Sequence, residues 1–341
     1  MAAWVHKRTL KQNVLHILPW LIAGLLLLWV LRRVPLQESW QTLRGLSGIQ
    51  IGSLVLLNFL ILVTLNGRWW LILRGQGYKV PFFTLFGYRL AAFGLSYFTP
   101  GPQFGGEPLQ VYLVEKEHNT PRPTAIAAVT LDKVLELILN FTFLLVGIVV
   151  ILQSRLLGVV GRETAVIPLL LLAIPLGFLL AIWFDWQPIS KTMRLGEQIA
   201  LWKRQPAWQK AYQDGRMAAY AAEIEAHQFC HQSPHMFLLA LFVSLVGWLL
   251  MIAEFWLMIL FLGLQLSMVQ LVIALTAARI TFLLLLPGGI GVFEAGQVFA
   301  FGALGLNPAI GISASLLIRG RDVILGVIGL WWGSRYLTPK K

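Results

Sequence analysis

Residues 100–107 read Pro-Gly-Pro-Gln-Phe-Gly-Gly-Glu, and residues 287–294 read Pro-Gly-Gly-Ile-Gly-Val-Phe-Glu. Both stretches open on Pro-Gly and place a carboxylate seven residues later, at Glu107 and Glu294. The same offset aligns a later proline, a later alanine and an apolar run in each half of the chain. Pro/Gly-interrupted hydrophobic segments at matching places in two halves are typical of a transporter's binding site. The two loops therefore predict an internal repeat organised around such a site.

The composition is that of an integral membrane protein. Of 341 residues, 57% are hydrophobic and 12% are charged, and the mean hydropathy is +0.73. The excess of 27 Lys and Arg over 15 Asp and Glu would indicate nucleic acid in a soluble protein. Here the basic residues follow the expected sides of a bilayer, so we expect no nucleic-acid partner. A single cysteine, Cys230, excludes an intrachain disulfide and a zinc site built from several thiolates.

The apolar runs predict an all-α polytopic fold. We expect about six full spans, at residues 14–31, 51–67, 124–152, 166–184, 236–262 and 309–333. Each of the two loops lies between two further helical segments, and both segments are short. We interpret each pair of segments, with its loop, as a re-entrant helical hairpin. Broken backbone is tolerated at membrane depth only where protein or water covers it. The hairpins therefore mark the interior of the protein.

We expect one membrane domain over residues 1–341, made of two repeats. Repeat one covers about residues 14–152 and repeat two about residues 166–335. Each repeat has three spans and one hairpin, so the halves should have opposite orientations in the membrane. The one extended hydrophilic stretch, residues 185–234, is expected to form interfacial amphipathic helices.

The distribution of Lys and Arg sets the expected topology. With both termini cytoplasmic, 18 basic residues fall inside and five outside, as the positive-inside rule requires. The first hairpin then enters from the cytoplasm and the second from outside. We expect the protein in the inner membrane of a bacterium.

Glu107 and Glu294 stand at helix starts, where a carboxylate can simply cap the helix. A functional interpretation adds that helix N-termini and glycine-rich turns can hold an anionic headgroup, with a protonated or paired Glu as a candidate proton carrier. We therefore predict a substrate-binding and translocation site formed by Pro100, Gly101, Gly105, Gly106, Glu107, Arg279, Pro287, Gly288, Gly289, Gly291, Glu294, Arg321 and Asp322.

Arginines inside spans need partners, because an unpaired guanidinium there costs about 3 kcal/mol or more. The offset that aligns the two loops also aligns Asp132 with Arg319. Residues related by a pseudo-two-fold axis in the membrane plane can meet near that axis, so we predict a buried Asp132–Arg319 ion pair between the halves. The alternative is that Arg319 pairs with Asp322, three residues on in the same helix.

Other motifs indicate little chemistry. His227, His231 and His235 recur at helical spacing near Cys230, but Pro234 breaks the helix and we expect no metal site. The glycines Gly329 and Gly333 form a small-xxx-small pair typical of a helix contact, and we expect valine to be tolerated better at Gly329 than at the loop glycines. No nucleotide loop, serine elbow or His-Glu zinc motif is present, so we expect neither catalysis nor a cofactor.

At the two loops the chain resembles the flippase-like family that includes the transmembrane region of lysylphosphatidylglycerol synthases. The matching elements are Gly105-Gly106-Glu107, the whole stretch 287–294, and Arg319. Gln110 departs from the family pattern, in which an arginine is expected after Gly-Gly-Glu. The resemblance implies lipid translocation. Bifunctional members append an aminoacyltransferase domain, whereas this chain ends at Lys341, and we expect a stand-alone member without aminoacyl transfer activity.

These observations predict a protein that moves an amphipathic lipid, with a phosphate-bearing or otherwise charged headgroup, between membrane leaflets. An alternative is a non-transporting partner that anchors or regulates an envelope glycosyltransferase or lipid synthase through residues 185–234. A membrane-embedded enzyme is a third interpretation, and it lacks a visible catalytic constellation.

Overall fold

The chain forms helices throughout the part that the computed structural model describes, residues 40–98 except residue 42, 105–154, 162–199, 206–281 and 291–337. No strand occurs in these ranges, as the predicted all-α class requires. In chain order the helices are α3 (Gly48–Gly75), α4 (Phe82–Phe98), α5 (Glu107–His118), α6 (Arg122–Ser154), a 3-10 turn (Arg162–Ala165), α7 (Val166–Trp183), α8 (Pro188–Ile199), α9 (Pro206–Gln232), α10 (Pro234–Phe261), α11 (Met268–Thr281), α12 (Val292–Ala303) and α13 (Pro308–Leu337).

Four of the described helices, α3, α6, α7 and α10, are long and apolar enough to cross a bilayer. They coincide with the predicted spans from 51, 124, 166 and 236 onward. Helix α13 is continuous over 30 residues, or about 45 Å at 1.5 Å per residue, but charged side chains interrupt its apolar character. The span predicted at residues 14–31 lies outside the described part. The chain is therefore a multi-pass helical membrane protein.

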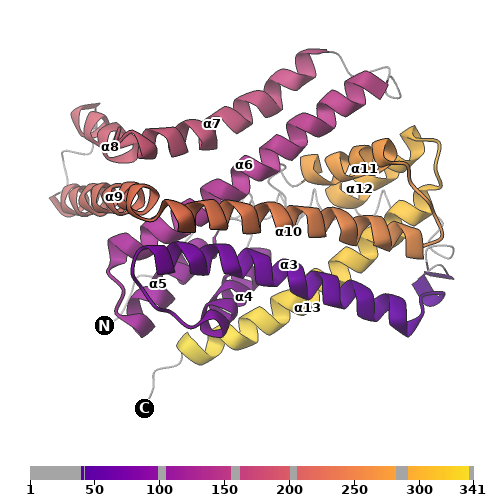
Figure 1. Cartoon of the computed structure of the whole chain (residues 1–341), viewed down its shortest axis with the longest axis horizontal. Helices are drawn as coiled ribbons and strands as arrows, with labels where there is room; N and C mark the ends of the chain where they lie inside the picture. The colour runs from indigo at the N-terminus through magenta and orange to yellow at the C-terminus, as the bar shows by residue number, and fades with distance from the viewer. Residues whose placement is uncertain are drawn as a thin grey trace, which may run out of the picture.

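Helices α3 and α10 lie side by side in opposite directions along the length of the molecule (Figure 1). At one end the Ser233 hydroxyl, just before α10, donates a hydrogen bond to the Gly75 carbonyl at the end of α3, at 2.8 Å. Further along, the Asn58 amide donates to Glu254 at 3.2 Å. The loops after α3 and after α10 therefore lie at opposite ends of the molecule.

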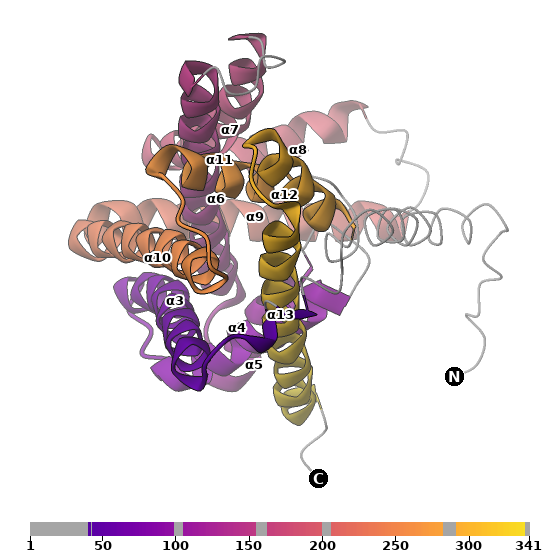
Figure 2. The same ribbon diagram turned by 90° about the vertical axis from the view of Figure 1, so that its right-hand side faces the viewer.

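As a result, the two short helical pairs lie at different ends of the bundle. Figure 1 places α4 and α5 toward the end where α3 stops, and α11 and α12 toward the end where α3 begins. Helix α4 packs along α13, and α11 packs along α6. Figure 2, which looks along α3 and α10, shows α13 passing beside them with α6 and α7 beyond.

The α4–α13 contact depends on glycine. A Cβ on Gly329 would lie 1.9 Å from the Leu90 carbonyl oxygen, and a Cβ on Gly94 would lie 2.5 Å from the Gly326 oxygen. The two backbones approach this closely only because side chains are missing, as is common in membrane helix pairs. The predicted helix contact at Gly329 is confirmed. A valine at Gly329 would meet backbone that cannot move aside, so the close contact leaves little room for a side chain there.

The hydrophilic stretch 185–234 forms α8 and α9. Helix α8 exposes Lys191 and Arg194 together with Leu195, which suits an amphipathic interfacial helix. Helix α9 packs on α6 and α7, and it buries Phe229 and Cys230 in the largest hydrophobic cluster. Helix α9 therefore lies against the long apolar helices α6 and α7.

Candidate functional site

The first tip, residues 105–107 between α4 and α5, is held by hydrogen bonds to its own backbone. The Gly105 N–H donates to Glu107 Oε2 at 2.8 Å, and the Gly106 N–H donates to Ser96 Oγ at 2.8 Å. A Cβ on Gly106 would lie 2.2 Å from the Ala92 carbonyl oxygen, so α4 and the tip require glycine there. Glu107 Oε1 also lies 3.5 Å from the Lys133 ammonium on α6.

The second tip, residues 291–294 before α12, has a similar arrangement. The Gly291 N–H donates to Glu294 Oε2 at 2.7 Å, and Gly291 has φ +81°, a conformation that glycine adopts at little cost. Glu294 Oε1 accepts a hydrogen bond from Arg319 Nε on α13 at 2.9 Å. Glu294 is buried, with 5% of its surface exposed. The carboxylate thus caps the turn and neutralises an arginine at the same time.

The two tips have the same arrangement of contacts around the glutamate. In each, a glutamate binds the backbone N–H of a preceding glycine and pairs with a cation from the next long helix. Glu294 follows Glu107 by 187 positions, and Arg319 follows Lys133 by 186. The capping role is confirmed for Glu294, which binds the N–H of the N-cap residue Gly291, whereas Glu107 binds Gly105, one residue before the N-cap of α5. The cation partners of both glutamates were not predicted from the sequence.

The predicted Asp132–Arg319 ion pair is wrong. Asp132 on α6 instead binds Arg68 of α3 at 2.6 Å and Arg89 of α4 at 2.7 Å, while Arg319 binds Glu294. Although the sequence offset aligns Asp132 with Arg319, each of the two residues pairs with a different residue on another helix. The alternative partner Asp322 binds Arg321 at 2.9 Å.

Arg68 is the most deeply buried cation of the described part, with 1% of its surface exposed. Besides Asp132 it lies 3.3 Å from Glu136, which in turn binds Lys133 at 2.9 Å. Arg68 is not among the site residues that the sequence predicted. A signal was present in the sequence, because Asp132 and Glu136 are one helical turn apart on a span and require cations.

Glu254 of α10 is a further buried carboxylate. Its carboxylate binds Arg321 of α13 at 2.9 Å and accepts the Asn58 amide at 3.2 Å. The order of charges along the chain differs between the Arg68–Asp132 pair and the Glu254–Arg321 pair. An arginine on α3 meets a carboxylate on α6, and a carboxylate on α10 meets an arginine on α13.

Arg279 of α11 lies beside an aromatic ring and a sulfur atom of α10. Its guanidinium lies 4.7 Å from the ring centre of Trp248 and 3.3 Å from the Met251 sulfur. It also lies in the electrostatic field of Glu136 on α6, of Glu254 on α10, and of Arg321 and Asp322 on α13. The interior thus holds a first charge set, Arg68, Arg89, Glu107, Asp132, Lys133 and Glu136, and a second charge set, Glu254, Arg279, Glu294, Arg319, Arg321 and Asp322.

The charge sets are neutral in sum, since each has as many carboxylates as cations. A buried ion pair does not by itself stabilise a fold, but removing one partner leaves a costly isolated charge. So many paired charges among apolar helices indicate a polar interior. Five predicted site residues, Pro100, Gly101, Pro287, Gly288 and Gly289, lie outside the described part.

Two histidines of α9 contact backbone carbonyl oxygens. His227 Nδ1 lies 2.9 Å from the Ile182 carbonyl oxygen, and His231 Nδ1 lies 3.1 Å from the His227 carbonyl oxygen. Within the described ranges, no three His, Cys, Asp or Glu side chains are grouped closely enough to hold a metal ion. Cys230 is fully buried, and this burial raises the pKa of its thiol to about 12.

Long apolar helices and a paired, charged interior define a multi-pass helical membrane protein. The family model described as "Lysylphosphatidylglycerol synthase TM region" matches residues 16–329. The chain belongs to this family, which the resemblance at the two loops predicted.

Three relatives carry the description "UPF0104 membrane protein" and come from archaea. Two are from Methanothermobacter thermautotrophicus, one 23% identical over 290 residues (83% of each chain) and one 25% identical over 315 residues (87% of each chain). The third, from Methanocaldococcus jannaschii, is 23% identical over 300 residues, covering 84% of this chain and 85% of its own. No solved structure matches the chain.

Proposed function

We propose that this protein moves an amphipathic lipid with a charged headgroup between the two leaflets of its membrane. The observation that carries the proposal is the repeated tip, in which a glutamate is held by glycine backbone and by a cation of the next long helix. Family membership supports it, since the matched region is the transmembrane part of a lipid synthase. The lipid tails would stay in the bilayer while the headgroup passes the tips.

A charged headgroup that crosses the membrane needs groups inside the protein that can pair with its charge. An isolated charge at the bilayer centre costs on the order of 3 kcal/mol on translocation scales and more in other estimates. The two charge sets could lower this cost by exchanging one of their own ion-pair partners for a group of the lipid. A phosphate would compete with a carboxylate for lysine or arginine, and arginine suits phosphate because its planar fork binds two oxygens.

The arrangement of helices supports an inverted repeat with two re-entrant hairpins. Helices α3 and α10 each have 28 residues, and α5 and α12 each have 12. The order of a long helix, a short pair and a long helix recurs from α3 to α6 and from α10 to α13. The antiparallel α3–α10 contact then lies near the pseudo-two-fold axis, and the two tips approach the interior from opposite ends.

The two tips differ in accessibility. The Glu107–Lys133 pair is 3.5 Å long, with side chains 26% and 24% exposed, whereas the Glu294–Arg319 pair is 2.9 Å long with side chains 6% and 14% exposed. The first pair is therefore the looser one, and a headgroup can reach it with less rearrangement. We propose that this conformation is open toward the first tip, and that transport alternates it with one open toward the second.

Leaflet exchange in liposomes tests the proposal. Purified protein should accelerate the movement of at least one tagged lipid among an anionic phospholipid, phosphatidylethanolamine, an aminoacylated phospholipid and a polyprenyl phosphate. Protein-free liposomes and liposomes with heat-inactivated protein give the baseline. Exchange at the baseline rate for all four lipids would contradict the proposal. The other interpretation, a partner for an envelope enzyme docked on α8 and α9, would then become the stronger one.

A further inference from the structure

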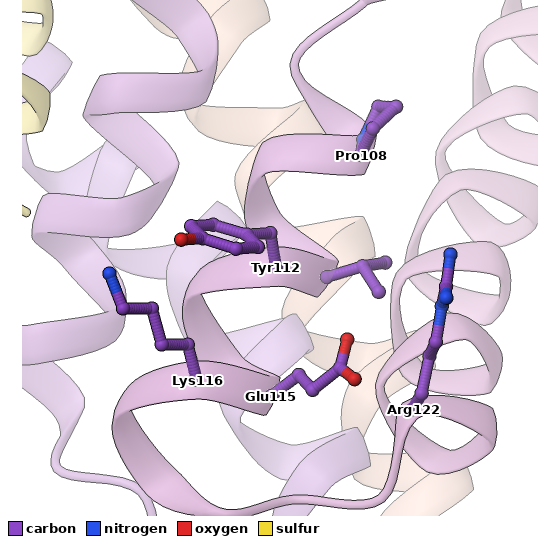
Figure 3. Close-up of a pocket in the computed structure, with 6 residues that line it drawn as sticks. Pro108, Tyr112, Glu115, Lys116 and Arg122 are labelled. Carbon is purple, nitrogen blue, oxygen red and sulfur yellow. The ribbon is translucent and has the colours of Figure 1, made fainter. Parts of the chain in front are cut away.

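An open groove runs along the outer side of α5, between this helix and the start of α6. Its volume is about 390 Å³, and it is lined by Pro108, Val111, Tyr112, Glu115, Lys116 and Arg122. Figure 3 shows Arg122 standing apart on the neighbouring helix, with Glu115 between it and Lys116 in this view. The groove does not include the charge sets of the interior.

The groove changes from apolar to charged along α5. Pro108 directly follows Glu107 of the first tip, and Val111 and Tyr112 come one turn later. The charged lining residues, from Glu115 onward, belong to the far end of α5 and the first residue of α6. A phospholipid in a leaflet has the same polarity, with a charged head toward water and apolar chains toward the membrane centre.

The three charged residues of the groove lack ion-pair partners in the described part of the chain, unlike the interior charge sets. Lys116 Nζ lies 5.3 Å from the ring centre of Tyr112, which holds it beside the groove. Arg122 is exposed, and Glu115 and Arg122 do not bridge the space between them although their charges are opposite. Both signs of charge are thus available to a ligand.

We propose that the groove binds a zwitterionic phospholipid, one whose headgroup carries a phosphate and an ammonium, such as phosphatidylethanolamine. The phosphate is bound by Arg122 and Lys116, the ammonium faces Glu115, and the acyl chains cover Pro108, Val111 and Tyr112. An anionic headgroup without an ammonium would leave Glu115 opposed by the phosphate, so the carboxylate makes the groove selective.

The inference rests on the proposed function for its purpose, because a lipid docked here has its apolar part beside the first tip and its headgroup at the far end of α5. The groove would hold the lipid before its headgroup moves along α5 to the looser of the two tips. Its binding chemistry can nevertheless be measured without transport. Failure of one claim is therefore distinguishable from failure of the other.

Native mass spectrometry of the full-length protein in detergent, with phosphatidylethanolamine and phosphatidylglycerol of matched chains, tests the groove. The wild-type protein should retain phosphatidylethanolamine in preference to phosphatidylglycerol. Glu115→Gln should reduce retention of phosphatidylethanolamine about two- to fivefold, the range for a partly exposed charge contact, without reducing that of phosphatidylglycerol. Arg122→Gln should weaken both lipids by a similar factor.

Arg194→Gln, which removes an exposed arginine of α8, is the matched control and should change neither lipid. All these side chains are partly or fully exposed, so the variants should fold. Preference of the wild-type protein for phosphatidylglycerol, or unchanged retention in both groove variants, would overturn the inference. Normal groove binding combined with no leaflet exchange of any lipid would instead overturn the proposed function.

Discussion

Glu294 and Arg319 form a largely buried ion pair at the second tip. This pair is found in place of the predicted Asp132–Arg319 pair. Alignment of the two halves identified Asp132 and Arg319 as equivalent positions, and from equivalence we predicted contact. The structure instead pairs Asp132 with Arg68 and Arg89. A pseudo-two-fold axis relates the surroundings of two equivalent residues. The two residues contact each other only if both also lie on that axis.

A double-mutant cycle separates the two pairings. Arg319→Gln should lower the free energy of unfolding by about 3 kcal/mol, because it leaves Glu294 buried without a cation. Adding Glu294→Gln should recover part of this loss, with a coupling of about 1 to 3 kcal/mol. Chemical unfolding in mixed micelles measures both values.

The control cycle combines Arg319→Gln with Asp132→Asn. These two residues have separate partners, so their effects should add to within about 0.5 kcal/mol. Strong coupling between Asp132 and Arg319, together with additivity between Glu294 and Arg319, would contradict the pairing described for the second tip.

Cys230 gives a prediction that depends on pH. Its pKa is raised to about 12 by burial, so the thiol stays protonated in the folded protein well above pH 9. Since the thiolate is the reactive form, maleimide should label the folded protein very slowly between pH 7 and pH 9. An added cysteine at the exposed position Gln228 should react readily over the same range. Equal labelling rates for the two thiols in folded protein would contradict the burial of Cys230.

At the scale of elements, the long helices could be predicted because apolar runs of sufficient length have few alternatives. The spans at 124–152, 166–184 and 236–262 agree with α6, α7 and α10 to within two residues, whereas α3 continues eight residues beyond the predicted end at residue 67. Helix α13 was also expected, although its three central charges weaken the apolar signal. Partners of the charges could not be predicted, because they depend on how α3, α4 and α6 are rotated against one another.

The glycine contact between α4 and α13 likewise could be predicted only in part from the sequence. The spacing of Gly329 and Gly333 indicated a helix contact but neither its partner nor its closeness. Gly329→Val should strongly destabilise the protein, because its Cβ would overlap the Leu90 carbonyl. Gly320→Val, on the same helix with nothing within 4 Å, should be tolerated. Fluorescence-detected size exclusion before and after heating compares them, and similar melting temperatures would contradict the close α4–α13 crossing.

At the scale of the whole molecule, topology follows from the antiparallel α3 and α10. Lys79 follows α3 and Gln265 follows α10, and both are exposed at opposite ends of the bundle. In intact cells an impermeant thiol reagent should label Gln265→Cys, and it should label Lys79→Cys only after permeabilisation. The buried Cys230 provides an unreactive background. Labelling of both cysteines from the same side would contradict the opposite orientation of the two halves.

The central claim is that the tip glutamates act in moving lipid, and leaflet exchange of variants tests it most directly. Glu107→Gln is the sharpest change, since this side chain is partly exposed and its loss should leave the fold intact. Glu225→Gln on α9 is the matched control. With a lipid that the wild-type protein exchanges, Glu107→Gln should fall to the rate of protein-free liposomes, while Glu225→Gln should keep the wild-type rate. Exchange by folded Glu107→Gln at the wild-type rate would contradict the account.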